Sequence, residues 1–293
     1  GLICNSETGD VTIAPNKKEA CAQIQIKNEA NSNATGIYVA DGKYLYIDAY
    51  TRYTDKSTRP ITRVQVDKIN IVSKNLAEDG RTNAIWLNPS AENGGDLDIN
   101  VFSQSSAFNI AVLGGYGGNG IAITQNDDAT YVANGGTIKI RNTCISIKGE
   151  NYNEWGIGFN PLATDARENS AGILVDVKNS TVDLGFGGGV QMDIAGNGLV
   201  VDADGAKVVI SKRAGTSTQK DASQILVPKG DLDYKFYSLA AYEGSIYLDV
   251  NETANKFKSS DIYTNGKIDG DMYVGEKGKI YAGLNGTNAY FNG

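Results

Sequence analysis

Three pairs of carboxylates are the residues whose type and spacing are best suited to chemistry: Asp96/Asp98, Asp127/Asp128 and Asp202/Asp204. Two carboxylates that flank a glycosidic bond can catalyse its hydrolysis. The first pair is the best placed, because alternation along a strand would turn both side chains outward. The other two pairs have the pattern of turns, in which Asp bonds to the local backbone. We interpret all three as surface residues and expect that the chain is not an enzyme.

Other signatures of catalysis or cofactor binding are missing from the sequence. Histidine is absent, which excludes a Ser-His-Asp or Cys-His arrangement. Arg141 could be the base of a lyase, but no cluster of acidic calcium ligands lies beside it. The Gly-rich runs at 114–120 and 185–189 lack the Lys-Ser/Thr ending of a phosphate-binding loop. We expect no cofactor and no metal site.

The three cysteines do not have the spacing of a metal site. Cys4 and Cys21 bracket a short polar segment, and a disulfide between them would close a small loop. Secreted chains often staple an exposed end in this way, and such a bridge contributes about 3 kcal/mol in the chain-entropy model. The alternative is two unpaired thiols near the terminus. Cys144 is left over and is expected to be a buried or corner residue.

Aromatic residues that alternate with aliphatic ones are the candidate ligand-binding residues. Alternation turns Tyr38 outward between Ile37 and Val39, and it places Trp86 in the same way between two aliphatic residues. Exposed rings on a rigid surface offer a large contact area with a polar tip. The alternative is that tyrosine is simply a good strand former. The predicted binding residues are Tyr38, Tyr44, Tyr46, Tyr50, Tyr53 and Trp86, with Tyr247 as a second candidate.

The elements that must position these residues are short strands in a repeat. Segment 172–179 matches segment 198–205 at an offset of 26 residues, and apolar bursts recur within it every 8 or 9 residues. Three short strands per repeat are what a three-sided β-helix requires, in which coils stack and inward side chains fill one core. Gly, Asn and Asp suit its turns. This period predicts roughly ten coils and a rod on the order of 50 Å long.

The rest of the composition agrees with an all-β chain. Hydrophobic residues make up 41% of the sequence, enough for a continuous core, and they occur in short bursts separated by Gly, Asn and Asp. Strand starts at Gly36, Gly120 and Gly156 do not follow the 26-residue period, which indicates loop insertions or starts on different faces. A β-sandwich or a propeller is the alternative. We expect residues 1–35 to cap the open end and residues 36–293 to form the β-helix.

The net charge of −7, without a long basic run, argues against nucleic acid or an anionic membrane as a partner. No apolar run approaches the length of a membrane helix, and no secretory signal opens the chain. If the protein is exported, we expect the signal to have been removed.

The Gly-[Ile/Leu]-x-[Val/Ile/Phe] strand starts, the Asn- and Gly-rich turns and the run from Gly266 to Gly283 resemble the passenger region of Gram-negative autotransporters, the type V secretion family. The resemblance implies a right-handed parallel β-helix of the pectin-lyase-like type. In the full-length protein such a passenger precedes an outer-membrane β-barrel anchor, which we expect to be absent from this chain.

The resemblance also implies a function. It predicts an adhesin displayed at the bacterial cell surface that mediates attachment, coaggregation or biofilm formation and contributes to virulence. The expected partner is a host or bacterial surface protein, a glycan, or another copy of the chain. Two alternatives stay open because one scaffold carries many functions. One is a polysaccharide lyase or hydrolase, and the other is an inert stalk that presents a distal module.

Overall fold

The computed structural model of the chain is built almost entirely of β-strands. It describes residues 2–4, 11–13, 22–30, 34–40, 44–48, 53–54, 60–61, 66–75, 81–89, 96–100, 107–113, 117–125, 130, 133–141, 144–149, 171–185, 190–194, 196–212, 223–227, 236–251, 267–284 and 287–292. Within these ranges there is no helix. The predicted all-β class is confirmed.

Most strands pair in parallel with an equivalent strand earlier in the chain and an equivalent strand later in the chain, which builds three ladders. One strand of each ladder, taken in chain order, is called a coil here. The first ladder contains β1 (Leu2–Cys4), β4 (Ala34–Val39), β9 (Arg81–Leu87), β12 (Gly117–Ile123), β15 (Ala171–Val175) and the first halves of β18 (Asn197–Lys212), β20 (Tyr237–Asn251) and β22 (Asp271–Leu284). The second contains β2 (Val11–Ile13), β5 (Tyr44–Asp48), β10 (Asp96–Asn100), β13 (Asn134–Arg141), β16 (Lys178–Gly185) and the second halves of β18, β20 and β22. The third contains β3 (Ala22–Ala30), β8 (Val66–Asn75), β11 (Ala107–Leu113), β14 (Cys144–Gly149), β17 (Val190–Asp193), β19 (Gln224–Leu226) and β21 (Lys267–Asp269).

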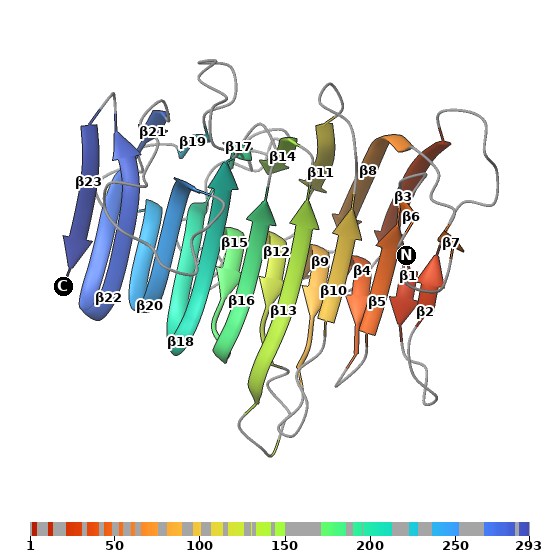
Figure 1. Ribbon diagram of the computed structural model, residues 1–293, viewed down its shortest axis with the longest axis horizontal. Coiled ribbons are helices and arrows are strands. Elements are labelled where there is room, and N and C mark those ends of the chain that lie inside the picture. Colours follow the sequence, from red (N-terminus) through yellow and green to blue (C-terminus); the bar gives the residue numbers. More distant parts are fainter. Residues whose placement is uncertain are drawn as a thin grey trace.

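The first two ladders belong to one strongly curled sheet of 14 strands, because β18, β20 and β22 each run through both. The third ladder is a separate sheet of 7 strands. Antiparallel pairing occurs where β23 (Thr287–Asn292) folds back on β22, and in the small pair of β6 (Tyr53–Thr54) and β7 (Pro60–Ile61). In Figure 1 the second-ladder strands cross the front of the molecule from β2, near the N-terminus, to β22 and β23 at the opposite end.

The strand register tests the predicted repeat directly. Ile173 lies opposite Leu199 and Val182 lies opposite Val208, so the 26-residue offset is confirmed for this coil. Other coils are longer, since Ile121 lies opposite Ile173, which follows it by 52 residues. Insertions use up chain length, and the first ladder therefore contains eight strands among the described residues, fewer than the predicted ten coils. Gly156 lies outside the described residues.

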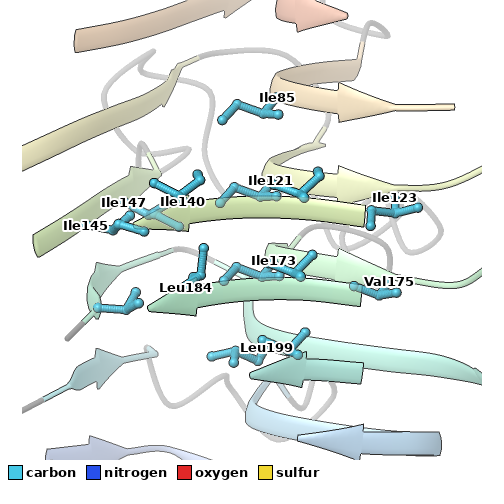
Figure 2. Packing of buried hydrophobic residues seen from close by; sticks show 14 of the residues in the cluster. Ile85, Ile121, Ile123, Ile140, Ile145, Ile147, Ile173, Val175, Leu184 and Leu199 are labelled. Atoms are coloured by element: carbon cyan, nitrogen blue, oxygen red, sulfur yellow. The ribbon is translucent and has the colours of Figure 1, made fainter. Parts of the chain in front are cut away.

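Equivalent aliphatic residues of successive coils stack in register and fill the core. In the first ladder Ile85, Ile121, Ile173 and Leu199 are fully buried and lie one above another (Figure 2). Strands of the other ladders supply Ile140, Leu184, Ile145 and Ile147 to the same cluster. Burying aliphatic surface contributes about 25 cal/mol per Å² removed from water, so this shared core is the main stabilising feature.

Small residues precede the first core residue in six first-ladder strands: Gly36, Ala84, Gly120, Gly172, Gly198 and Ser238. Side chains of the third ladder approach the four glycines closely. A Cβ atom on Gly120 would lie 2.6 Å from the carbonyl oxygen of Gly172 and 2.6 Å from Cγ2 of Ile147. A Cβ atom on Gly198 would overlap the carbonyl oxygen of Ser238. The described Gly-Ile and Gly-Leu starts therefore mark positions where an isoleucine or methionine side chain of the third ladder packs against backbone.

Asparagine side chains connect successive coils next to these small residues. The Oδ1 atom of Asn119 accepts a 2.9 Å hydrogen bond from the backbone N–H of Ala171, and its Nδ2 atom donates a 2.9 Å bond to Oδ1 of Asn83. Asn197 accepts a 2.8 Å bond from the backbone N–H of Tyr237 in the same way. Each side-chain amide oxygen thus accepts a hydrogen bond from a backbone N–H group at a corner, and this side-chain bond takes the place of a bond between strands.

The corner that leads into the second ladder uses left-handed backbone. Asn179 has φ 56° and Gly205 has φ 68°, and the register places them on successive coils. Asn and Gly tolerate this conformation best. The expectation that Gly and Asn supply the turns is confirmed at these two positions.

The predicted N-terminal cap, residues 1–35, contains β1, β2 and β3, which pair with β4, β5 and β8. Cys4 ends β1 opposite Val39, while Cys21 lies outside the described residues. The disulfide and the capping role of this segment stay predictions. Cys144 is the first residue of β14.

The glycine positions lead to a stability prediction. We expect Gly198→Ala to lower the free energy of unfolding by about 1–3 kcal/mol, because the added methyl group overlaps backbone of the next coil. Asp204→Ala is the control, since Asp204 is exposed on the same strand and its replacement should change stability by less than about 0.5 kcal/mol. Urea denaturation measures both. Wild-type stability in the Gly198 variant would contradict the described packing.

Buried serines lead to a second prediction. Ser73 and Ser180 are fully buried, and their hydroxyls have no hydrogen-bond partner among the described residues. Ser238 is equally buried, but its hydroxyl donates a 2.8 Å bond to the carbonyl oxygen of Asp271. Thermal and urea denaturation should show Ser73→Ala and Ser180→Ala unchanged or stabilised, and Ser238→Ala destabilised by about 1 kcal/mol. Equal losses in all three variants would disprove the distinction.

Candidate functional site

The outer side of the first ladder carries an unbroken column of apolar residues. Each member occupies the same register position on its coil, between two inward-facing residues. The column, called here the first-ladder column, consists of Tyr38, Trp86, Ala122, Leu174, Val200, Ala240 and Tyr273. Outward positions on a solvated sheet are ordinarily polar. Seven apolar residues in succession distinguish this side of the first ladder from an ordinary solvated sheet face.

One end of the column is an aromatic pair. The rings of Tyr38 and Trp86 lie with centroids 4.9 Å apart and tilted by 50°, and both side chains are partly buried. The indole N–H of Trp86 donates a 3.2 Å hydrogen bond to the carbonyl oxygen of Thr124, on the next coil. The Tyr38 hydroxyl accepts a 3.3 Å bond from the side-chain amide of Asn88. These contacts fix both rings against the ladder.

The other end is a cluster of three tyrosines. The Tyr273 ring lies 4.7 Å from the ring of Tyr242 and 5.4 Å from that of Tyr237. Tyr242 is 38% exposed and Tyr273 is 37% exposed, and they are the two exposed large hydrophobic residues among those that the structure describes. This end of the column therefore presents accessible ring surface to solvent.

Small aliphatic residues form the middle of the column. Ala122 and Ala240 are fully buried and Val200 is only 7% exposed, even though their side chains point away from the main core. Val200 and Ala240 belong to a second, smaller hydrophobic cluster, against which Leu174 and Tyr237 pack. The middle of the column therefore leaves little aliphatic surface accessible to solvent.

The matching register positions of the other two ladders have different chemistry. In the second ladder, Tyr46, Asp98, Lys139, Asp183, Val209, Tyr247 and Tyr281 follow one another. The Tyr247 and Tyr281 rings stack 4.8 Å apart with an interplanar angle of 5°. In the third ladder the positions are Gln25, Asn70, Asn109, Ser146, Gln191 and Gln224. Only the first ladder has an all-apolar column at these positions.

Carboxylates line the edge of the first ladder near the tyrosine cluster. Asp176 and Asp202 are exposed on successive coils, and Asp202 lies opposite Glu243 in the register. Partial desolvation of its carboxyl raises the pKa of Asp202, and the charge of Glu243 raises it further. Glu243 accepts a 3.0 Å hydrogen bond from Nζ of Lys277, which raises the pKa of that ammonium group.

The structure brings together only part of the predicted binding set. Tyr38 and Trp86 are paired on the first ladder, whereas Tyr44 and Tyr46 belong to β5 of the second ladder, on either side of buried Leu45. Tyr53 lies in β6, and Tyr50 lies outside the described residues. The six residues therefore do not form a single described site, and their role in binding stays a prediction.

The two described carboxylate pairs lie on different strands and do not form one site. Asp96 and Asp98 lie on β10 on either side of Leu97, which is buried as expected. Asp202 and Asp204 are exposed on β18, directly before the left-handed residue Gly205. Asp127 and Asp128 lie outside the described residues. Arg141, the residue considered as a lyase base, ends β13 opposite Asn100 and Gly185.

Sequence reasoning missed the tyrosine cluster at the C-terminal end of the column. Met272-Tyr273-Val274 has the same alternation as Ile37-Tyr38-Val39, so the signal for Tyr273 was available. Tyr242 is harder to find, because the register shifts between Ala241 and Glu243 and interrupts the alternation.

Comparisons with protein-family models, with curated proteins and with solved structures find no match to this chain. Among the residues with described side chains, no group of three or more His, Cys, Asp or Glu residues could hold a metal ion. The part of the chain that the structure describes also has no helix long and apolar enough to cross a membrane.

The raised pKa of Asp202 predicts a pH dependence of stability. The Asp202 carboxyl binds its proton more tightly in the folded state than in the unfolded state. The free energy of unfolding therefore falls as pH rises from the ordinary pKa of 3.8 through the folded-state pKa. We expect Asp202→Asn to be more stable than wild type above this interval and equal to it below pH 3.8. Thermal melts across acidic and neutral pH measure the difference. Asp204→Asn removes the same charge from the same strand and is the control; a wild-type pH profile in Asp202→Asn would contradict the assignment.

Proposed function

We propose that this chain is a right-handed, three-sided parallel β-helix of the autotransporter passenger type. Three features support the proposal: the three parallel ladders, the aliphatic columns stacked inside them, and the asparagines that connect coils at a corner. Strands of a few residues cannot bury their own apolar faces, and stacking coil on coil solves this. The right-handed sense comes from the family resemblance alone.

The function that fits this rod best is adhesion. The protein is displayed at the bacterial surface, anchored in the outer membrane in its full-length form, and mediates attachment, coaggregation or biofilm formation. The observation that carries this proposal is the first-ladder column, which places aromatic rings on the outside of a rigid stack where solvation alone would favour polar residues. Its partner is a surface molecule of a host or a neighbouring cell.

Cell attachment tests the proposal. The chain is displayed on a non-adherent bacterium through a heterologous outer-membrane anchor, and attachment to host cells and to other bacteria is counted. We expect display to cause attachment or clumping, and Tyr38→Ala combined with Trp86→Ala to reduce it severalfold, because the ring pair is removed. The control is Tyr281→Ala, which removes a ring from the second ladder.

Protease resistance and surface exposure of each displayed variant show whether it is folded. If display of wild-type protein causes neither attachment nor clumping, the adhesin proposal fails. If the folded Tyr38/Trp86 variant attaches as well as wild type, those two residues do not belong to the binding surface.

A further inference from the structure

We propose that Tyr247 and Tyr281 are an oxidative cross-linking site, at which a one-electron oxidant joins the two phenol rings by a carbon–carbon bond. The product is a bityrosyl bridge that ties β20 to β22 on the outer side of the second ladder. The class of oxidant is a haem peroxidase that uses hydrogen peroxide. This inference goes beyond the proposed adhesive function and does not rest on it.

The two rings are related by the same translation as the strands that carry them. Tyr247 lies opposite Tyr281 in the parallel register of β20 and β22, which lie side by side near the C-terminal end (Figure 1). The ring centroids are 4.8 Å apart and the interplanar angle is 5°. Because parallel strands are themselves about 4.8 Å apart, the two side chains have the same conformation and each ring atom lies beside its counterpart. The ring carbons next to the hydroxyl groups, where tyrosyl radicals couple, are therefore matched.

The other ring pairs among the described residues are less suited to this coupling. The Tyr242 and Tyr273 rings are tilted by 39°, and those of Tyr237 and Tyr273 are tilted by 44° with centroids 5.4 Å apart. A tilted pair turns the edge of one ring toward the face of the other, so equivalent carbons do not lie side by side. The pair of Tyr38 and Trp86 contains a single phenol.

Both rings of the site are open to an oxidant while their backbone is held by the core. The side chains of Tyr247 and Tyr281 are partly exposed, whereas Ile246 and Ile280, which precede them in the chain, are fully buried. On its other side, Tyr247 lies opposite Val209, which cannot form a phenoxyl radical. Tyr281 is therefore the tyrosine that the register of β18, β20 and β22 places beside Tyr247.

The chemistry of the bridge balances with hydrogen peroxide as the terminal oxidant. Each phenol gives one electron and one proton to the oxidant and becomes a phenoxyl radical, whose unpaired electron is shared with the carbons next to the oxygen. The two radicals form one carbon–carbon bond between these carbons. Each bonded carbon then loses its hydrogen as a proton, and each phenoxyl oxygen gains one, which restores both phenols. Two electrons and two protons have left the protein, and they reduce one hydrogen peroxide to two molecules of water.

Oxidation of the purified protein followed by peptide mapping tests the site. The protein is treated with a haem peroxidase and hydrogen peroxide, the monomer is isolated by size exclusion, and bityrosyl fluorescence and mass spectrometry of a tryptic digest are measured. Trypsin cuts after Lys and Arg, so Tyr247 is released in segment 236–256, Tyr281 in segment 280–293 and Tyr273 in segment 268–277. We expect 236–256 joined to 280–293 with the loss of two hydrogens, because the held geometry favours coupling of these two rings.

Phenylalanine variants locate the bridge. Tyr247→Phe and Tyr281→Phe each keep an aromatic ring but remove the phenol, and each should abolish the link between 236–256 and 280–293. The matched control is Tyr242→Phe, which removes a phenol from the same tryptic segment as Tyr247 and should leave the link unchanged. Thermal melts before oxidation establish that each variant is folded.

The bridge should also change stability. Oxidised wild-type monomer should unfold at a higher urea concentration than oxidised Tyr247→Phe monomer, because the link restricts the unfolded chain between β20 and β22. The comparison of two oxidised proteins removes the effect of oxidation elsewhere in the chain. Equal urea midpoints would contradict a bridge between these two strands.

Three results of the peptide map would overturn the proposal. The first is the absence of a link between 236–256 and 280–293 in the oxidised monomer. The second is the persistence of that link in the folded Tyr247→Phe or Tyr281→Phe variant. The third is a main link elsewhere, either from 236–256 to 268–277, as the tilted pair of Tyr242 and Tyr273 would give, or within 280–293, between Tyr281 and Tyr290 of β23. None of these results bears on whether displaying cells attach, so the adhesin proposal is tested separately.

Discussion

Parallel backbone pairing between successive coils holds equivalent residues about 4.8 Å apart, and every other feature of the structure depends on that spacing. Ile121 can pack on Ile173, and Asn119 can reach the backbone N–H of Ala171, only because the register aligns their coils. The same spacing leaves no room for a side chain at Gly198, whose Cβ atom would meet the next coil. Once the register is set, each position along a coil becomes a column along the stack, and the chemistry of the surface is decided column by column.

The features that could be predicted from sequence are those in which one residue type repeats at one position. The Gly-Ile starts and the 26-residue match between 172–179 and 198–205 indicated the stacked strands, and the register of Ile173 with Leu199 agrees. The outward placement of Tyr38 and Trp86 followed from simple alternation and agrees with the burial of their neighbours Ile37 and Ile85. In these cases local sequence and long-range packing demand the same residue.

What could not be predicted depends on contacts between segments that are distant in sequence. Coil lengths vary because insertions leave the core unchanged, so the pairing of Ile121 with Ile173 across 52 residues has no local signal. The predicted aromatic set mixed two surfaces, since nothing local distinguishes the strand of Tyr44 from that of Tyr38. Which aromatic residues share a surface is decided by which coils stack, and a register shift such as the one before Glu243 hides Tyr242 from any periodic pattern.

The strands that run through two ladders have a mechanical consequence. In β22 the first half carries Tyr273 and the second half carries Tyr281, with unbroken chain between them, and β20 pairs alongside nearly all of its length. Tension applied to the aromatic surface at this end would pass through peptide bonds into a long row of inter-strand hydrogen bonds loaded together in shear. Such a row resists force better than bonds opened one at a time, so we expect β20 and β22 to resist shear along their length.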